Sequence, residues 1–403
     1  MKRVLNFVLL TALCMLAPLG CSSKPSSDNP LLRDDAALTI GYRSSQEFEK
    51  RYPQLLKNEF PNLNYTVISN SEVWMDDQTP ADWMAQHPAD LVYVPYTRMK
   101  EFISEGLILD LSSFIKTGRL QLDSYVPAAI ELAKQLGDGN LYGIPPSIDS
   151  RVIVYNKTLF EQQKIDFPSP PLTWDQFLLL SQRFPYGLAA LEPAPIFFLT
   201  DIGSTLGYRL YQTSPPASLV DNPGWQSVWA MVEEPIAKQN IRFGDIDDFI
   251  SGKCAMAIIN YRQYATIEHI KPDFQWELAP MPIDPQNPDS SPLFSAEGFY
   301  AISAQTAYPD AALELLKFLT SSTAAKWEVN IYGISSNKSV TPSDYLAAVG
   351  QLTPSPYFDD IPAEFIGWGN EAILSIQQGI SREDALAAYK QKTSEFVSGQ
   401  SSP

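Results

Sequence analysis

The sequence predicts an α/β protein with mostly parallel sheets and about two globular domains. Short apolar runs alternate with segments of helical period along the first half of the chain, which is the pattern of βαβ units. The length of 403 residues corresponds to about two domains of roughly 150 residues each. A content of 45% hydrophobic and 12% aromatic residues is enough to fill two cores, so the chain is not disordered.

The elements of the first half follow one another in a regular order. The apolar run 37–41 predicts a strand, and the capping-box pattern Ser44–Glu47 opens a helix to about Asn58. Further strands are expected at 65–69 and 90–94, and a helix over 97–105 ends at Gly106. These alternations favour a parallel sheet.

The pattern resumes in the second half of the chain. We predict strands at 151–155, 255–259 and 274–278, and helices opened by capping boxes at Thr158–Glu161 and Thr173–Gln176. Trp225 and Trp229 are four residues apart and in phase with Val228 and Val232, so they indicate the apolar side of a helix. Trp174, Trp276 and Cys254 are also expected in the core, the last as an inert buried thiol.

Composition excludes several classes of function. The chain has 46 Asp and Glu against 29 Lys and Arg, a formal charge of −17, so it lacks the basic footprint of a nucleic acid binder. Two His and three Cys disfavour zinc hydrolases, His-based triads, iron–sulfur clusters and disulfide frameworks. No nucleophile elbow, phosphate loop or calcium loop occurs, so we expect no catalytic residue, no metal and no cofactor.

The N-terminus predicts export. Lys2 and Arg3 precede an apolar stretch over 4–16, which fits a signal peptide and is shorter than the ~20 residues of a spanning helix. A small residue directly before Cys21, with a polar tract after it, resembles a bacterial lipobox, although Pro18 stands where that pattern usually has Leu. The resemblance implies that residues 1–20 are a lipoprotein signal peptide and that Cys21 is diacylated, with palmitate-type chains. An ordinary secretory signal with an incidental Cys21 remains open.

Four stretches carry a more specific resemblance. They are ADLVYVPYTRMKEFISEGLILDLSSFI from Ala89, GNLYGIPPSIDSRVIVYNKTLFEQQKIDFPSPPLTWDQF from Gly139, FISGKCAMAIINY from Phe249 and FSAEGFYAISAQTAYPDAALELLKFLTS from Phe294. Their order and spacing resemble those of the extracellular solute-binding proteins of ABC importers, in particular the maltose-binding-like family 1. The resemblance implies a two-lobe periplasmic-binding-protein-like fold of type II, in which both lobes are discontinuous and are joined by hinge strands.

That resemblance sets the expected domain boundaries. A flexible linker over 21–37 precedes an N-terminal lobe of residues 38–148 plus 299–337 and a C-terminal lobe of residues 149–298 plus 338–400. The chain is expected to cross between the lobes near 148–150, 295–298 and 335–341. Gly298 suits a hinge because it can absorb a change in backbone dihedral angles.

Candidate ligand-binding residues lie after predicted strand ends, where open α/β sheets bind ligands. Some follow strands directly, and others are also placed by the family resemblance; together they are Tyr42, Arg43, Trp74, Tyr96, Arg98, Asp149, Tyr261, Glu297 and Trp368. Flat apolar rings and charged hydrogen-bonding groups are what a polyhydroxylated ligand requires. Each residue also has a structural explanation: solvated ion pairs for the arginines, crevice or loop packing for the aromatic residues, and capping of a chain reversal for Asp149.

We therefore expect a substrate-binding lipoprotein that is not an enzyme. The family resemblance implies a monomer, lipid-anchored to the outside of the bacterial cell membrane, that captures a sugar or oligosaccharide and delivers it to ABC permease subunits. Three alternatives stay open. The same fold could bind a peptide, polyamine or phosphorylated solute, could serve as a sensor subunit, or could be a secreted hydrolase using Asp149 and Glu297 as its two carboxylates.

Overall fold

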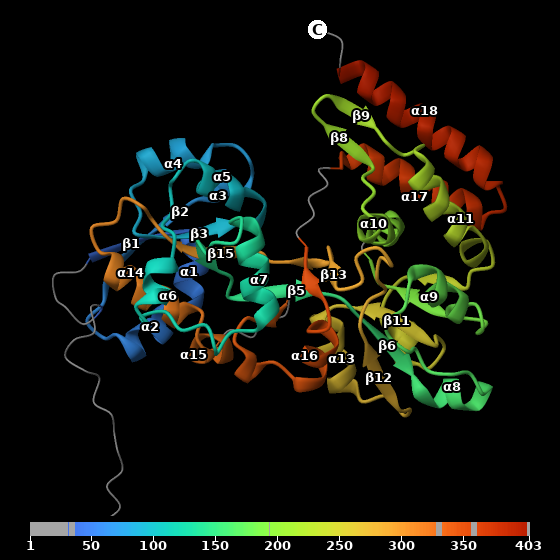
Figure 1. Cartoon of the computed structure of the whole chain (residues 1–403), viewed down its shortest axis with the longest axis horizontal. Helices are drawn as coiled ribbons and strands as arrows, with labels where there is room; N and C mark the ends of the chain where they lie inside the picture. The colour runs from blue at the N-terminus through green and yellow to red at the C-terminus, as the bar shows by residue number, and fades with distance from the viewer. Residues whose placement is uncertain (1–30, 32–36, 193, 328–332, 356–360, 401–403) are drawn as a thin grey trace, which may run out of the picture.

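The computed structural model describes residues 31, 37–192, 194–327, 333–355 and 361–400. Figure 1 shows two lobes side by side, with strand β5 (Ser147–Ser150) between them. The predicted signal peptide, Cys21 and nearly all of the linker lie outside the described residues. Within the described residues, no helix combines the length and apolar character needed to cross a membrane.

The first lobe is built on a five-stranded sheet of order β2-β1-β3-β15-β4. Its strands are β1 (Ala37–Tyr42), β2 (Asn64–Ser69), β3 (Leu91–Pro95), β4 (Gly143–Ile144) and β15 (Gly298–Ile302). β1 pairs in parallel with β2 and β3, whereas β15 runs antiparallel to β3 and β4. The helices of this lobe are α1 (Ser45–Arg51), α2 (Pro53–Glu59), α3 (Ser71–Trp74), α4 (Pro80–Gln86), the 3-10 turn η2 (Tyr96–Arg98), α5 (Met99–Ser104), α6 (Ser112–Lys116), α7 (Pro127–Leu136), α14 (Pro309–Leu319) and α15 (Ser322–Trp327).

The second lobe has a five-stranded sheet of order β10-β7-β11-β6-β12. Its strands are β6 (Val152–Asn156), β7 (Leu188–Ala190), β10 (Ile241–Phe243), β11 (Met256–Ile259) and β12 (Trp276–Ala279). Helices α8 (Lys157–Gln163), α9 (Trp174–Ser181), α10 (Pro195–Thr205), α11 (Pro223–Ala237), α12 (Asp247–Ile250), α13 (Tyr261–Ile270) and α16 (Ser343–Val349) pack around it. Figure 1 shows α17 (Ala363–Gln377) and α18 (Arg382–Gln400) beside the hairpin of β8 (Tyr211–Thr213) and β9 (Pro216–Ser218) at the top of this lobe.

A small three-stranded sheet joins the lobes. β5 lies between β14 (Phe294–Ser295) and β16 (Ile334–Ser335) and runs antiparallel to both, with Asp149 opposite Ser295. The three segments expected to cross between the lobes thus lie side by side. Nearby, β13 (Ser290–Ser291) pairs in parallel with β17 (Thr353–Pro354), and η3 (Lys338–Val340) follows β16.

Local sequence explains most element boundaries and two differences from expectation. Thr173 and Gln176 form the predicted reciprocal capping box of α9. The single helix expected from Ser44 to Asn58 is instead two helices, because Pro53 starts a new one at its first position. The capping box expected at Thr158 is wrong, since Asn156 caps α8 by accepting from the amide of Leu159 at 2.9 Å.

The core predictions for three tryptophans are confirmed. Trp174, Trp225 and Trp229 are at most 1% exposed, and all lie in the core of the second lobe. Cys254 is fully buried and unpaired, and burial raises its pKa to about 11. Trp276 is only partly buried and packs against the hydrophobic core from β12.

Candidate binding cleft between the lobes

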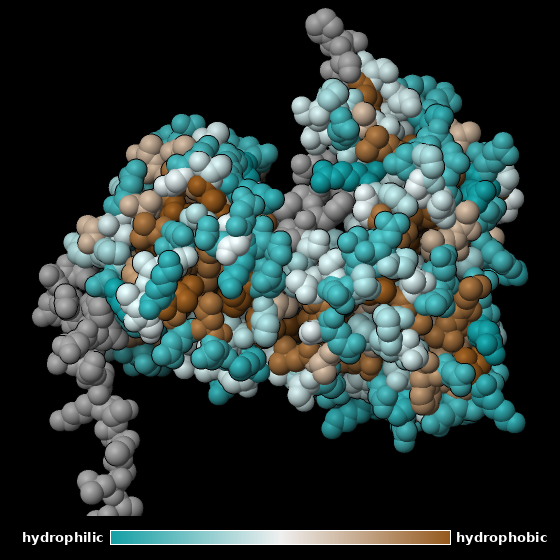
Figure 2. Space-filling view, in the orientation of Figure 1, coloured by the Kyte–Doolittle hydropathy of each residue, from teal (hydrophilic) through white to brown (hydrophobic). Residues whose placement is uncertain are grey.

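One edge of the first sheet collects several of the predicted residues. Tyr42 pairs with Ser69, and Pro95 pairs with Gly298, so the ends of β1, β2 and β3 lie beside the start of β15. The residues that follow or precede these strand ends therefore share one edge, which is where open α/β sheets bind ligands. Figure 2 shows the surface hollowed between the two lobes.

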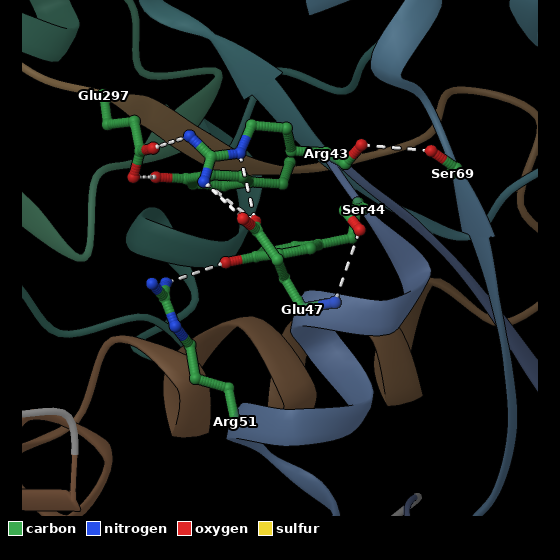
Figure 3. Close-up of polar contacts among 8 residues, drawn as sticks. Arg43, Ser44, Glu47, Arg51, Ser69 and Glu297 are labelled. Atoms are coloured by element: carbon green, nitrogen blue, oxygen red, sulfur yellow. Dashed lines mark hydrogen bonds and ion pairs between the residues drawn. The ribbon is translucent and has the colours of Figure 1, made fainter.

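Arg43 is the centre of a polar cluster at this edge. Its Nε and Nη2 donate to Glu47 at 3.1 and 2.8 Å, while Nη1 pairs with Glu297, so the guanidinium lies between two carboxylates (Figure 3). Burial alone would lower the pKa of Arg43, but Glu47 and Glu297 raise it by more. The Arg43 side chain is 36% exposed, so its charge remains accessible to a solute.

Stacked aromatic rings adjoin this cluster. Trp74 stacks on Tyr93 with centroids 5.3 Å apart, Tyr93 stacks on Tyr42 at 5.0 Å, and the Arg43 guanidinium lies 5.7 Å from the Trp74 ring. A Cβ atom at Gly298 would lie 3.0 Å from Cη2 of Trp74 and 2.5 Å from the Val94 carbonyl oxygen. The glycine is therefore needed for the indole to reach this position.

The remaining predicted residues of the first lobe lie behind or beside the Arg43 cluster. Tyr42 is 2% exposed, and its hydroxyl accepts from Arg51 at 3.1 Å. Tyr96 is also buried; its amide donates to the Glu297 carbonyl at 3.1 Å, and its ring stacks on Phe299. The largely buried Arg98 pairs with Asp76 and, at 2.7 Å, with Glu101.

The corresponding edge of the second sheet collects charged residues. Val152 pairs with Ile259, and Ala190 pairs with Ile258, so the start of β6 lies beside the ends of β11 and β7. Arg151 precedes β6 directly, Tyr261 follows β11, and Glu192 follows β7 by two residues. Asp149 on β5 is therefore two residues from Arg151 and belongs to this edge of the lobe.

Arg151 forms ion pairs with two largely buried carboxylates. Its Nη2 pairs with Glu192 at 3.0 Å and its Nη1 with Asp201, whose side chain is 9% exposed. Burial raises the pKa of Asp201, and it raises the pKa of Asp149 to about 6, in each case against the lowering effect of Arg151. The Oδ1 atom of Asp149 is withdrawn from solvent and has no hydrogen-bond partner among the described residues.

Three tyrosines pack against one another beside the end of β5, and Asp149 acts electrostatically on one of them, Tyr345. The fully buried Tyr345 on α16 donates its hydroxyl to the Ser150 carbonyl at 2.9 Å, and its ring lies 5.4 Å from Tyr261 and 5.1 Å from Tyr264. Tyr264 in turn donates to Asp344 at 3.0 Å. Tyr261 begins α13 at the sheet edge and is only partly buried, so it can contact a solute.

Trp368 is not tied to either polar cluster by any contact among the described residues. It is partly buried on α17, with its ring 6.2 Å from Phe365 and 6.0 Å from Phe396. The adjacent Gly369 lets α17 approach α10, since a Cβ there would lie 2.7 Å from Ile196. The role of Trp368 in binding therefore stays a prediction.

Sequence reasoning missed five members of these clusters, Glu47, Tyr93, Arg151, Glu192 and Asp201. Two signals were available. Glu47 is four residues from Arg43 across a helix start, which is the spacing of a helical ion pair. Glu192 follows the short apolar run 188–191, so the same strand-end rule that selected Arg43 applies to it. In the described part of the chain, no set of three or more His, Cys, Asp or Glu side chains could hold a metal ion.

The comparisons with known proteins agree with this architecture. A family described as bacterial extracellular solute-binding protein matches residues 44–326. The maltodextrin-binding protein MdxE of Bacillus subtilis is 25% identical over 340 residues, which are 78% of this chain and 76% of that protein. A binding protein of Brucella abortus is 28% identical over 131 residues, but the match spans only 30% of its length.

Solved structures share the fold at low sequence identity. An extracellular solute-binding protein family 1 from Alicyclobacillus acidocaldarius has a TM-score of 0.67 at 15% identity, covering 90% of this chain and 98% of that one. The sugar-binding protein MalE of Xanthomonas citri has a TM-score of 0.62 at 15% identity, covering 91% and 98%. The two-lobe periplasmic-binding-protein fold predicted from the sequence is thereby confirmed. Because the family match covers most of the chain, the protein belongs to the bacterial extracellular solute-binding protein family.

Proposed function

We propose that this protein is a lipid-anchored, monomeric substrate-binding protein that captures a sugar or oligosaccharide and delivers it to an ABC permease. The observation that carries the proposal is the pair of polar and aromatic clusters at the two sheet edges, one on each side of the three-stranded connection. Such an arrangement lets a solute contact both lobes at once and favours the closed form by hinge motion.

The chemistry of the clusters suits a polyhydroxylated solute. Arg43, Glu47 and Glu297 combine donors and acceptors for hydroxyl groups, and Trp74 supplies a flat apolar surface beside them. Micromolar capture requires about −8 kcal/mol, which a few charge-assisted hydrogen bonds and one stacked ring can supply after closure costs. The names of MdxE and MalE, which state maltodextrin and sugar binding, support the same solute class.

We also propose the expected lobe boundaries, with residues 38–148 plus 299–337 in one lobe and 149–298 plus 338–400 in the other. The membership of β15 in the first sheet and of β6, β7, β10, β11 and β12 in the second supports this division. Closure should occur about the sheet of β14, β5 and β16. X-ray scattering with and without saturating solute tests this, because hinge closure must reduce the radius of gyration.

The test of solute class is a thermal-shift screen against neutral, acidic and amino sugars, peptides and polyamines. A solute that binds only the folded state raises the melting temperature by mass action. Titration calorimetry on Arg43→Lys, which loses the bidentate fork, should show at least tenfold weaker binding than the parent. The matched control is Lys57→Arg, an exposed helix cation outside both clusters. A screen in which no carbohydrate binds, or turnover of a glycoside by the purified protein, would contradict the proposal.

Delivery and anchoring need separate tests. Deletion of the chromosomal copy should abolish uptake of the identified solute, and loss of signalling with uptake intact would instead assign a sensor subunit. Cys21 should carry the lipid, which mass spectrometry of the membrane-extracted protein can detect on the mature N-terminus. Two acyl chains give stable membrane association, where a single chain would be marginal.

A further inference from the structure

The cluster of the second lobe carries more negative than positive charge. In the second lobe, Arg151 is the cation of a set that contains Asp149, Glu192 and Asp201. In the first lobe, Arg43 lies between Glu47 and Glu297. The protein as a whole has a formal charge of −17. An anionic solute would be repelled by the second-lobe set and by the net charge of the protein, so phosphorylated and uronic-acid ligands are disfavoured.

Asp149 is the group in this set with unused binding capacity. Arg151 is already engaged by Glu192 and Asp201, whereas Oδ1 of Asp149 is buried without a hydrogen-bond partner among the described residues. The charge of Asp149 acts on Arg151, Asp201 and Tyr345, which places the carboxylate among them. A buried acceptor left unsatisfied is costly, so this oxygen is suited to a donor that arrives with the solute.

One aromatic ring lies near this carboxylate. Asp149 acts electrostatically on the fully buried Tyr345, and the partly buried Tyr261 lies edge-on to Tyr345 with ring centroids 5.4 Å apart. Phenol rings attract cations through their quadrupole. A carboxylate near such a ring, within a set that has more carboxylates than cations, favours a cation over a neutral hydroxyl, because only the cation offsets the excess of negative charge.

We infer that the captured solute carries a protonated amine, as an amino sugar does, and that Asp149 binds this ammonium group. The inference rests on the proposed sugar-binding function and narrows its solute class. The ammonium group donates a charge-assisted hydrogen bond to Oδ1 of Asp149. The sugar ring and its hydroxyl groups face the Arg43 cluster and Trp74 across the cleft.

The test compares solutes that differ in the amine alone. Calorimetric titration is carried out with glucosamine tetramer, its N-acetylated counterpart, maltotetraose and a galacturonate tetramer, with spermidine as an amine without a sugar. We expect the amine-bearing tetramer to bind at least tenfold more tightly than the N-acetylated one, and the galacturonate tetramer not to bind. Asp149→Asn should reduce the amine preference to less than threefold while the protein still melts cooperatively. Asp166→Asn, an exposed carboxylate in a surface loop, is the charge-matched control and should keep the preference.

The outcomes separate the two proposals. Equal or tighter binding of the neutral tetramers, or an amine preference that survives Asp149→Asn, overturns the amine inference and leaves sugar capture standing. If spermidine is the only probe that binds, and Asp149→Asn abolishes its binding, the result supports the amine site and overturns the sugar assignment. Binding of none of the five probes contradicts the amine inference, and a library screen that yields only peptides contradicts both.

Discussion

Asp149→Asn should stabilise the free protein at alkaline pH although it damages the proposed site. Burial raises the pKa of Asp149 from 3.8 to about 6, so the folded protein holds an ionised carboxylate at pH 8 in surroundings that disfavour it. Two pKa units at 1.36 kcal/mol each correspond to about 3 kcal/mol of folding free energy lost on ionisation. An isosteric amide removes this penalty, because it carries no charge at any pH.

The pH dependence follows from the direction of the shift. A carboxyl group whose pKa is raised on folding stabilises the folded state when it is protonated, and that contribution is lost as the pH rises through about 6. The difference between Asp149→Asn and the parent should therefore be largest near pH 8 and shrink below about pH 4. With about 2–4 °C per kcal/mol for a lobe of this size, the variant should melt several degrees higher at pH 8.

The assay is a series of thermal melts from pH 4 to pH 8 without solute, with Asp166→Asn as the control for loss of one exposed charge. The control should show no comparable pH-dependent difference. If Asp149→Asn melts below the parent at pH 8, or if the difference is independent of pH, the stabilising effects of Arg151 and the Ser150 amide on the carboxylate outweigh burial and the reasoning is wrong. Calorimetry on the same variant should show weaker solute binding, so stability and affinity move in opposite directions.

Four further changes test the site, the core, the hinge and the anchor. Trp368→Ala should weaken sugar binding by about 1–3 kcal/mol through lost stacking; unchanged binding with a much lower melting temperature would assign it to the packing around Phe365. Trp229→Ala, which removes a fully buried ring, should mainly lower the free energy of unfolding by about 3–5 kcal/mol in denaturant titrations. Gly298→Ala should push β15 away from β3, shift Trp74 and reduce affinity at least tenfold by calorimetry, because its Cβ would lie 2.5 Å from the Val94 carbonyl oxygen and 3.0 Å from the Trp74 ring. Cys21→Ser should release the protein into the medium with its melting curve unchanged, and retention at the membrane would refute the anchor.

The elements of the fold could be predicted from the sequence because the patterns that specify them are local. Strand ends, the cap of α9 and the buried faces of Trp225 and Trp229 all depend on residues within a few positions of one another. The helix break at Pro53 was also present in the sequence, since proline at a first helical position starts a helix more readily than it continues one. Trp74 was expected in a stretch without helical period, but it is the last residue of the single-turn helix α3.

The site was accessible only in part, because its contacts join distant segments. The strand-end rule selected Arg43, but its partner Glu297 is 254 residues away. Arg151 and Asp201 are 50 residues apart, and nothing local to either residue indicates that they pair. Their pairing depends on how α10 packs against the start of β6, which is a tertiary property. Sequence patterns can therefore mark the edge of a sheet that carries the site without specifying the ion pairs on it.

These ion pairs also bear on how capture could drive closure. In the free protein, burial raises the pKa of Asp149, so its ionised form weakens the fold at neutral pH. A solute that donates to Asp149 relieves this penalty only when bound, and a solute that also reaches Arg43 must contact both sheets. The free energy recovered at Asp149 would then add to the contacts made across the cleft and favour the closed form over the open one. Affinity and hinge motion would be coupled through the same carboxylate, which is why Asp149→Asn should reduce both binding and the scattering change that accompanies it.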